Sequence, residues 1–558
     1  MALIDTRRPQ MFPVLTPAQM ETARRFASGE PRRFEPGEMV FAVGEVRAPV
    51  WLVLEGQIDV SRHDGRGQAA PIATEAAGQF SGEVSQLAGR PALAAGRAGP
   101  EGVTAVPFDA AHLRALVIGA AELGEIVMRA LILRRVALIE AGGAGSVLIG
   151  PPGSPALVRL LGFLTRNAYP VTVLDSTQAG EGRELVERFG LAQDELPVML
   201  CPNGTLLKRP SDAEAAACLG ITPELDPERL YDVAVVGAGP AGLATAVYAA
   251  SEGLSVLVLD QRAVGGQAGA SARIENYLGF PTGISGQALA GRAFNQAQKF
   301  GAEIALPLEA ATLGCPDRAG EPLTLGLSNG GTVRARTVVI ASGARYRRPN
   351  IKGLADFEGA GISYWASPVE AKLCEGEEVA LIGGGNSAGQ AVVFLAPKVS
   401  RLHLVVRAGG LEASMSAYLI EQIRTLANVE LHTHTEVTGL EGDAARGLTG
   451  AAFRNRLTGE ARRRALRHLF LFVGADPNIG WLGDCVQSDA RGFILTGSAA
   501  SDFPGAAARP ASSLETSLPG VFAIGDVRAG STKRVAAAVG EGAAVVAQIH
   551  AVLAAMSA

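Results

Sequence analysis

The sequence predicts an α/β protein with several domains, because two glycine-rich turns each follow a short apolar strand and open a helix. The first turn covers residues 237–242 and the second covers residues 383–388. The chain has 558 residues, 48% of them hydrophobic and 19% charged, which suits packed domains rather than a disordered chain. We therefore expect two α/β units of similar build after an N-terminal region of different texture.

The N-terminal region divides into two parts with different patterns. The first begins with β-type runs between glycines, such as MVFAVGE, and continues with helical spacing from His112 to Glu140. The second alternates strand and helix patterns, as a small α/β domain does. We expect a small β-barrel with helices at 1–142, a small α/β domain at 146–223, and a larger α/β region with parts at 228–347, 348–475 and 476–558.

The most specific signal in the chain is YDVAVVGAGPAGLATAVYAASEGLSVLVLD, residues 231–260. Gly237 would permit the tight turn after the strand, Gly239 would let the backbone approach a pyrophosphate, and Gly242 would let the helix pack closely. The helix N-terminus supplies N–H donors for phosphates. Asp260 ends the second strand, where a carboxylate can accept hydrogen bonds from a ribose. This order predicts a dinucleotide site rather than a turn that binds nothing.

A second nucleotide pattern follows in EEVALIGGGNSAGQAVVFLA, residues 377–396. It is the G-x-G-x-x-A variant, in which alanine replaces the third glycine. The next strand, in RLHLVVRAGG, ends at Arg407 rather than at an acid. A guanidinium suits the 2′-phosphate of NADPH, which a carboxylate would repel, so we expect NADPH rather than NADH. The alternative is a solvated surface arginine.

Several shorter motifs accompany the two turns. They are Gly265-Gly266-Gln267, Glu275-Asn276, Ala341-Ser342-Gly343 and Gly525-Asp526, the last ahead of a helix rich in small residues. With these motifs in order, the chain from Leu230 to Ala551 resembles the low-molecular-weight thioredoxin reductases, which are FAD-dependent pyridine nucleotide-disulfide oxidoreductases. The resemblance implies two Rossmann-like three-layer domains, with FAD in the first and NADPH in the second, and a homodimer.

The resemblance also implies roles for individual residues. Asp526 would meet the ribityl or pyrophosphate part of FAD, and the following helix would point its positive N-terminus at the flavin ring. The residues expected to bind FAD are Gly237, Gly239, Pro240, Ala241, Gly242, Asp260, Gly266, Gln267, Asn276, Ser342, Gly343, Gly525, Asp526, Lys533, Arg534 and Val535. The residues expected to bind the second nucleotide are Gly383, Gly385, Asn386, Ser387, Ala388 and Arg407.

The resembling family carries Cys-x-x-Cys-Asp where this chain reads ASPVE, with Ala366 and Val369 in place of the cysteines. Alanine and valine cannot attack a flavin or resolve a mixed disulfide. Glu370 could still shuttle a proton, and Cys374 could be a lone redox thiol. The alternatives are a helix-start acid and a buried structural cysteine. We therefore expect no internal dithiol relay and an external electron acceptor: a redox protein such as a ferredoxin-like carrier, a quinone or O₂.

The first N-terminal part resembles cyclic-nucleotide-binding domains. Glu83 matches the ribose contact of that family, whereas Ala92 and Ala95 replace the arginine and the hydroxyl residue that hold the cyclic phosphate. Arg90 and Arg97 are out of phase with the motif. We expect a degenerate domain that does not bind cAMP tightly.

The second N-terminal part resembles a thioredoxin-like domain. Leu196-Pro197 precedes a strand, as the cis-proline of that fold does. The active-site position reads Pro151-Pro152-Gly153-Ser154 without a cysteine pair, so this domain also looks degenerate. We expect Cys201 and Cys218 to be core residues.

Composition argues against several other classes of protein. The 50 basic and 55 acidic residues leave a net charge of −5, which gives no reason to expect nucleic acid as a partner. The N-terminus lacks a signal-peptide core, and charges interrupt the apolar stretch 110–141, so we expect a cytoplasmic protein without a membrane span. The five cysteines are scattered and no metal-ligand spacing appears, so we expect neither a disulfide framework nor a metal site.

Together these patterns predict an FAD-dependent NAD(P)H oxidoreductase that resembles thioredoxin-disulfide reductase. It would pass a hydride from NADPH to FAD and the electrons onward to an external acceptor. One alternative is a diflavin disulfide reductase with a second flavin at the 383–388 turn. The other is a non-catalytic redox sensor, in which the flavin state changes the contacts of the N-terminal domains.

Overall fold

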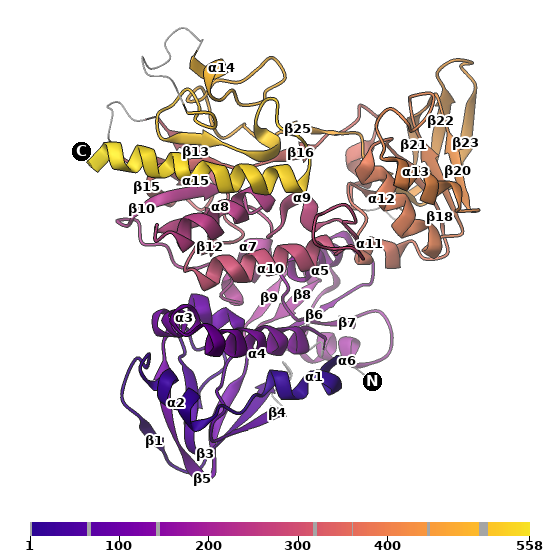
Figure 1. The fold of residues 1–558 in the computed structure, drawn as a ribbon. Helices are drawn as coiled ribbons and strands as arrows, with labels where there is room; N and C mark the ends of the chain where they lie inside the picture. The colour runs from indigo at the N-terminus through magenta and orange to yellow at the C-terminus, as the bar shows by residue number, and fades with distance from the viewer. Residues whose placement is uncertain are drawn as a thin grey trace.

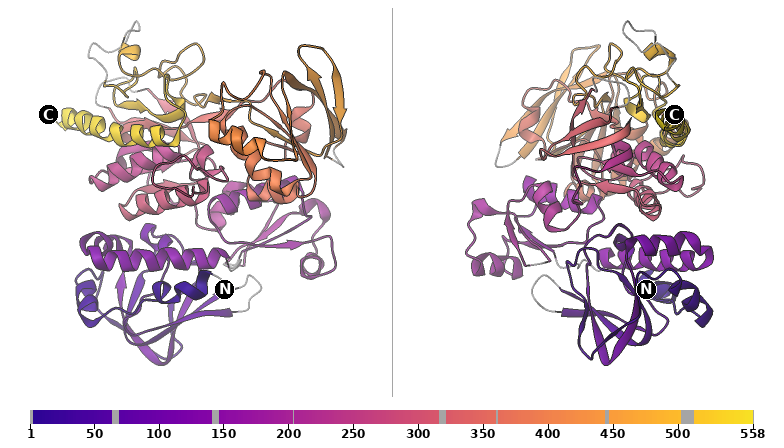
Figure 2. Two further views of the ribbon diagram at one scale, coloured as in Figure 1. Left: turned by 45° about the vertical axis from the view of Figure 1, so that its right-hand side comes forward. Right: turned by 90° about the vertical axis from the view of Figure 1, so that its left-hand side faces the viewer.

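The chain forms an N-terminal β-rich unit, a small α/β unit and two larger α/β units, as a computed structural model shows (Figure 1). The structure describes residues 3–63, 69–140, 146–202, 204–315, 321–359, 361–443, 447–501 and 512–557. The predicted boundary after residue 142 lies outside these ranges. In the left view of Figure 2, the N-terminal unit lies below the first larger unit, and the small α/β unit lies below the second larger unit.

The N-terminal unit is an antiparallel β-structure covered by helices, so the predicted class of this part is confirmed. Its strands β1 (Arg32–Phe34), β5 (Ala95–Phe108), β3 (Val50–His63) and β4 (Ala69–Ala76) pair in that order, and β2 (Met39–Phe41) pairs with β5. Its helices are α1 (Leu3–Met11), α2 (Pro17–Arg24), α3 (Ala110–Gly119) and α4 (Ala121–Glu140). The helical pattern predicted from His112 onward is divided at Ala120, whose ψ of 83° is not helical.

A buried ion pair connects α4 to β4. Arg134 Nη1 lies 3.2 Å from Glu75 Oε1, and both side chains are buried. Arg134 also donates hydrogen bonds to the carbonyl oxygens of Met11 at 2.8 Å and Phe80 at 2.6 Å. Burial raises the pKa of Glu75 to about 7, although the arginine opposes this shift. The guanidinium therefore connects three separate segments of the unit.

The small α/β unit contains a four-stranded sheet. The strand order is β7 (Thr172–Asp175), β6 (Val147–Gly150), β8 (Val198–Leu200) and β9 (Leu206–Lys208), and the helices are α5 (Pro155–Arg166), α6 (Glu181–Arg188) and α7 (Asp212–Cys218). Strands β6 and β7 are parallel, whereas β8 is antiparallel to both β6 and β9. The Leu196–Pro197 peptide bond is cis, as expected. The thioredoxin-like character of the unit stays a prediction.

The expectation for the cysteines needs a correction. Cys201 and Cys218 form a disulfide rather than packing as separate core residues, and Cys315 forms a second disulfide with Cys485. The fold brings their Cα atoms to 6.2 Å and 5.7 Å, within the range that a disulfide bridges. Sequence separations of 17 and 170 residues match no pairing motif, so neither pairing could be read from the spacing.

The first larger unit is built on a mainly parallel sheet. Its strands run in the order β12 (Glu303–Ala305), β11 (Val256–Leu259), β10 (Leu230–Val236), β15 (Thr332–Ile340), β14 (Leu323–Leu327) and β13 (Ala310–Gly314), and β26 (Val521–Ala523) also pairs with β15. Its helices are α8 (Pro240–Ser251), α9 (Gly266–Gly269), α10 (Gly286–Lys299), α14 (Ser498–Ser501) and α15 (Val535–Ser557). The carboxyl ends of β10, β11, β15 and β26 share one edge, where such sheets bind ligands.

The helix α15 is the only described helix long and apolar enough to cross a membrane by length and composition alone, over Val535–Met556. It runs alongside α8 in Figures 1 and 2. Val545, Val546 and Ile549 of α15 are buried in the same core cluster as the alanines of α8. Packing in the core of the first larger unit therefore accounts for its apolar face.

The second larger unit has a five-stranded parallel sheet and a smaller antiparallel one. The first sheet has the order β17 (Ile362–Ser363), β24 (His468–Leu471), β18 (Glu378–Ile382), β19 (Arg401–Val405) and β20 (Val429–His432), and the second comprises β21 (Thr435–Asp443), β22 (Gly447–Asn455) and β23 (Ala461–Arg464). Its helices are α11 (Pro368–Leu373), α12 (Asn386–Leu395) and α13 (Ala417–Arg424). Strand β16 (Ala344–Tyr346) lies where the chain passes from the first larger unit to the second, and β25 (Ala475–Pro477) lies where it returns. The two strands pair with each other, so the two connecting segments lie side by side.

Replacing Arg134 with Met should lower the free energy of unfolding of the N-terminal unit by about 3–5 kcal/mol, because Glu75 would stay buried without its partner. Arg129→Met on the same helix removes an exposed arginine that contacts Glu125 and should cost less than about 1 kcal/mol. Urea unfolding of the full chain, followed by circular dichroism, measures both effects. Equal losses in the two variants would contradict the importance of the buried pair.

Candidate functional site

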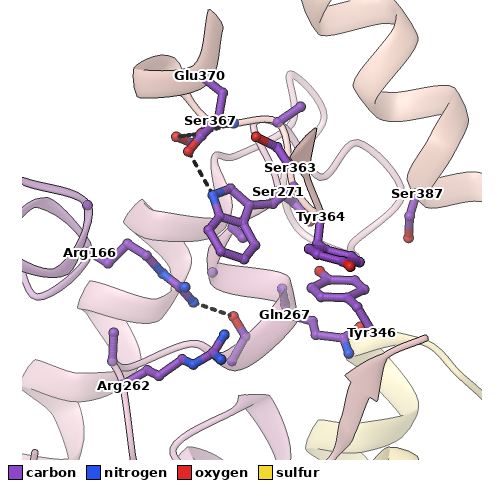
Figure 3. Close-up of a pocket in the computed structure, with 18 of the residues that line it drawn as sticks. Arg166, Arg262, Gln267, Ser271, Tyr346, Ser363, Tyr364, Ser367, Glu370 and Ser387 are labelled. Carbon is purple, nitrogen blue, oxygen red and sulfur yellow. Dashed lines mark hydrogen bonds between the residues drawn. The ribbon is translucent and has the colours of Figure 1, made fainter. Parts of the chain in front are cut away.

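A cavity of about 1920 Å³ lies at the carboxyl edge of the first parallel sheet. Its walls come from the small α/β unit and from both larger units, and they include residues of both predicted nucleotide turns. Pockets for drug-sized ligands measure about 300–1,000 Å³, so this cavity has room for a dinucleotide together with a second molecule. Figure 3 shows the part of the cavity where the three units meet.

The turn between β10 and α8 has no space for a side chain at two glycines. A Cβ on Gly242 would lie 1.9 Å from the carbonyl oxygen of Gly237, and a Cβ on Gly237 would lie 2.2 Å from that of Ala341. A Cβ on Gly239 would meet only the Cα of Gly266, at 3.9 Å, so this backbone faces open space. No described side chain caps α8, which leaves its first N–H groups available to a pyrophosphate. The turn therefore fits the dinucleotide that the sequence predicts.

Asp260 ties this turn to the end of β11. Its Oδ2 accepts a hydrogen bond from the N–H of Ala238 at 2.9 Å, and its Oδ1 accepts from those of Arg262 at 2.8 Å and Ala263 at 3.2 Å. Burial raises the pKa of this carboxyl. Asp260 also lines the cavity, and its oxygens have lone pairs left for ribose hydroxyls.

The Gly525-Asp526 motif is held in place by a residue that no sequence motif indicated. Glu541, within α15, accepts hydrogen bonds from the N–H of Gly525 at 2.6 Å and from Arg528 Nη2 at 2.6 Å. Lys533 Nζ donates to the carbonyl oxygen of Asp526 at 2.5 Å. Asp526 lines the cavity, and burial raises the pKa of its carboxyl group. These contacts fix the segment that leads into the N-terminus of α15.

The structure brings most of the predicted FAD residues into one cavity wall. Those that line it are Gly237, Gly239, Pro240, Ala241, Asp260, Gly266, Gln267, Asn276, Ser342, Gly343, Gly525, Asp526, Lys533, Arg534 and Val535. Of the residues predicted for the second nucleotide, Asn386 and Ser387 line the cavity, whereas Gly383, Gly385, Ala388 and Arg407 lie outside it. Arg407 is exposed beyond β19, so its contact with a 2′-phosphate stays a prediction.

The small α/β unit contributes a cation to the cavity wall that the sequence did not reveal. Arg166, the last residue of α5, donates from Nη2 to the carbonyl oxygen of Gly266 at 3.2 Å and lies 5.9 Å from the ring centre of Trp365. Figure 3 shows Arg166 next to Arg262. Burial, with Arg262 adding to it, lowers the pKa of Arg166. Two neighbouring guanidinium groups favour an anionic ligand.

An aromatic pair lies on the other side of the cavity, as Figure 3 shows. The rings of Tyr346 and Tyr364 stack with centroids 6.2 Å apart and an interplanar angle of 20°. Tyr364 donates from its hydroxyl to Glu358 Oε1 at 2.5 Å, and burial together with this bond raises its pKa to about 12. Planar ring systems stack well on such aromatic faces, so the pair suits an isoalloxazine or a nicotinamide.

The Glu370 carboxylate accepts hydrogen bonds at the start of α11. Its Oε1 accepts a hydrogen bond from Trp365 Nε1 at 2.9 Å, and its Oε2 accepts one from the N–H of Ser367 at 3.0 Å (Figure 3). The Ser367 hydroxyl contacts the same oxygen. This is the pattern of a helix-start acid, and a role in proton transfer stays a prediction.

Cys374 is fully buried in the core of the second larger unit. Its Sγ lies 3.6 Å from the carbonyl oxygen of Ala371, and burial raises the pKa of the thiol to about 11. Because the thiolate is the reactive form, this environment agrees better with a structural cysteine than with a redox thiol. None of the described residues that line the cavity is a cysteine.

In the N-terminal unit, the two arginines considered for a cyclic phosphate have other partners. Arg90 Nη2 donates to the carbonyl oxygen of Ile304 at 3.4 Å, and its guanidinium lies 5.3 Å from the ring centre of Phe294. Burial lowers the pKa of Arg90 to about 10. Arg97 donates to a backbone carbonyl of its own unit, and Glu83 is buried and caps a short helical turn. Arg90 therefore docks this unit onto the first larger unit.

A glycine-rich turn that fits a dinucleotide lies at the edge of one parallel sheet, and residues of a second glycine-rich turn line the same cavity. This arrangement is typical of nucleotide-binding α/β proteins. Residues 231–542 match the family described as pyridine nucleotide-disulphide oxidoreductase, and the chain belongs to this family. It is an FAD-dependent oxidoreductase whose cofactors are FAD and NADPH. Residues 31–118 match the cyclic nucleotide-binding domain.

Similar proteins include an alkyl hydroperoxide reductase component of Pseudomonas putida, 33% identical over 320 residues that cover 57% of this chain and 58% of that protein. Thioredoxin reductase of Treponema pallidum is 33% identical over 313 residues, 56% of this chain and 94% of that protein. The crystal structure of T. acidophilum thioredoxin reductase superposes with a TM-score of 0.51 at 30% identity, covering 58% of this chain and 99% of that one. The chain thus spans little more than half the length of the alkyl hydroperoxide reductase component.

Replacing Gly242 with Ala should lower the affinity for FAD at least tenfold, or about 1.4 kcal/mol, because the new Cβ would force the turn to open. Gly291→Ala on α10 is the control, since a Cβ there meets nothing within 4 Å, and it should leave FAD binding unchanged. Titration of the deflavinated chain with FAD, followed by flavin fluorescence, measures both. Wild-type affinity in Gly242→Ala would contradict the fit of this turn.

Proposed function

We propose that the protein takes a hydride from NADPH through FAD and delivers the two electrons to an external acceptor, with no cysteine pair at the flavin. FAD supplies the centre that accepts a hydride and releases the electrons again. The observation that carries the proposal is the cavity wall, which contains no cysteine among the described residues. Thiol chemistry at a flavin needs a sulfur that reaches the ring.

The residues of the chain bind and enclose the reacting groups. The N-terminus of α8 and the open backbone at Gly239 would hold the pyrophosphate, and Asp260 would hold a ribose. Ser387, at the start of α12, faces the same cavity from the second larger unit. The Tyr346–Tyr364 pair would limit access of water to the rings. Hydride transfer depends on this mutual positioning.

The Cys201–Cys218 disulfide is the strongest candidate for an internal relay, and we assign it a structural role. Cys218 ends α7, whose first residue, Asp212, lines the cavity. A helix of seven residues is about 10 Å long, so Cys218 lies about one helix length from Asp212. Direct exchange with a reduced flavin would need that helix to move.

The acceptor is proposed from the relatives. The names of the relatives specify the reduction of alkyl hydroperoxide and of thioredoxin. Because thioredoxin is a redox protein, the acceptor we favour is an oxidised redox protein. A quinone or O₂ is the alternative. A cytoplasmic location and a homodimer are part of the same proposal.

Anaerobic mixing with NADPH tests this function. The full chain should contain one FAD, and NADPH should bleach the flavin absorbance faster than NADH does. A second bound flavin without bleaching by either nucleotide would establish the diflavin alternative. Slow bleaching without turnover on a thioredoxin-class protein, a quinone or O₂ would establish the sensor.

The double variant Cys201→Ser, Cys218→Ser serves as the control for the route of the electrons. Turnover should stay within about twofold of the wild type, because neither sulfur faces the cavity. Normal bleaching with lost turnover would show that this disulfide carries electrons, and it would overturn the proposed route while leaving FAD reduction intact.

A further inference from the structure

We propose that the second larger unit carries a zinc site formed by His403, Glu430 and His432. His403 lies in β19, and the other two lie in the neighbouring edge strand β20. In the parallel register His403 is paired with Glu430, and side-chain alternation places Glu430 and His432 on the same face of β20. The three donors therefore converge on one face of the sheet.

The distances between the donor atoms match the edges of a metal tetrahedron. His403 Nδ1 lies 3.0 Å from His432 Nε2 and 3.3 Å from Glu430 Oε2, and His432 Nε2 lies 3.5 Å from Glu430 Oε1. Zinc binds nitrogen and oxygen ligands at about 2.0–2.2 Å, which separates tetrahedral ligands by about 3.3–3.5 Å. An ion would thus require only small movements of the side chains.

A second carboxylate orients the buried imidazole. His403 Nε2 lies 2.7 Å from Glu378 Oε1, on the adjacent strand β18. An ionised carboxylate only accepts hydrogen bonds, so this contact places the ring proton on Nε2 and directs the lone pair of Nδ1 toward His432. A ligand imidazole that donates its other N–H to a carboxylate is the usual arrangement in zinc sites.

The surroundings are apolar on one side and open on the other. Phe453 of β22 packs edge-on against both imidazoles, with centroid distances of 6.0 Å to His403 and 5.6 Å to His432. The His403 side chain is fully buried, whereas that of Glu430 is 41% exposed and leaves room for water as a fourth ligand. Glu430 also pairs with Arg464 at 3.3 Å and Arg401 at 3.8 Å, and its remaining lone pairs can serve an ion at the same time.

The three ligands indicate which ions the site would bind, and their position indicates the role of the ion. Two imidazoles and one carboxylate suit zinc and neighbouring transition metals, whereas magnesium and calcium prefer oxygen ligands. None of the three ligands lines the nucleotide cavity, so the ion would connect β19 to the edge strand β20 rather than take part in hydride transfer.

Calorimetric titration of the EDTA-dialysed full chain with zinc chloride tests the site. We expect one zinc ion per chain with a micromolar or lower Kd. His432→Ala and Glu430→Gln should each weaken binding at least tenfold, because the first removes a ligand and the second replaces an anionic oxygen ligand with a neutral amide. Cobalt chloride should give the visible absorption of a tetrahedral site in the wild type and not in these variants.

His550→Ala is the matched control, since it removes an exposed histidine that contacts Glu252 at 2.8 Å away from the cluster, and zinc affinity should be unchanged. A circular dichroism spectrum equal to that of the wild type verifies that each variant is folded, and Glu430→Gln decides the outcome if His432→Ala does not fold. Absence of saturable binding in the wild type, or equal affinity in all variants, would overturn the proposal.

Discussion

The close backbone packing at the start of α8 is the constraint on which the site depends. Strand β10 lies between β11 and β15 in a parallel sheet, so the three carboxyl ends meet at one edge. There Gly237 approaches the backbone of Ala341, and Gly242 approaches that of Gly237, at distances that admit no Cβ. This packing points the N-terminus of α8 into the cavity. It thereby sets where a pyrophosphate binds. The position of the pyrophosphate in turn determines where in the cavity the flavin ring lies relative to the second larger unit.

The features that the sequence could predict are local ones. The two nucleotide turns and the acid at Asp260 each lie within a short stretch whose residue types indicate its conformation. The cis peptide bond before Pro197 is expected from the resemblance to the thioredoxin fold. The residues that escaped prediction act across long separations. Arg166 meets Gly266, and Cys315 meets Cys485 at a separation of 170 residues. Such contacts depend on how the units dock, which no periodicity or spacing records.

Arg90 and Arg97 of the N-terminal unit contact carbonyl oxygens of the protein. In the N-terminal unit, Arg90 reaches across to Ile304 of the first larger unit instead of facing a cyclic phosphate. Arg134 and Glu75 use a buried ion pair to hold α4 on the sheet. The matched fold of residues 31–118 is therefore compatible with a docking role, in which the N-terminal unit covers α10 of the first larger unit.

The predicted flavin site likewise keeps the fold of the resembling enzymes without their cysteine pair. The cavity keeps the first glycine-rich turn, the aromatic pair and part of the second turn. Its described wall presents Ala366 at one of the two positions where the resembling enzymes carry a cysteine. The most direct measurement is an anaerobic titration of the full chain with NADPH, counted per bound FAD. One equivalent, which delivers two electrons, should complete the bleaching if no disulfide shares the electrons. A requirement for two or more equivalents would mean that a disulfide is reduced along with the flavin, and it would contradict the central claim.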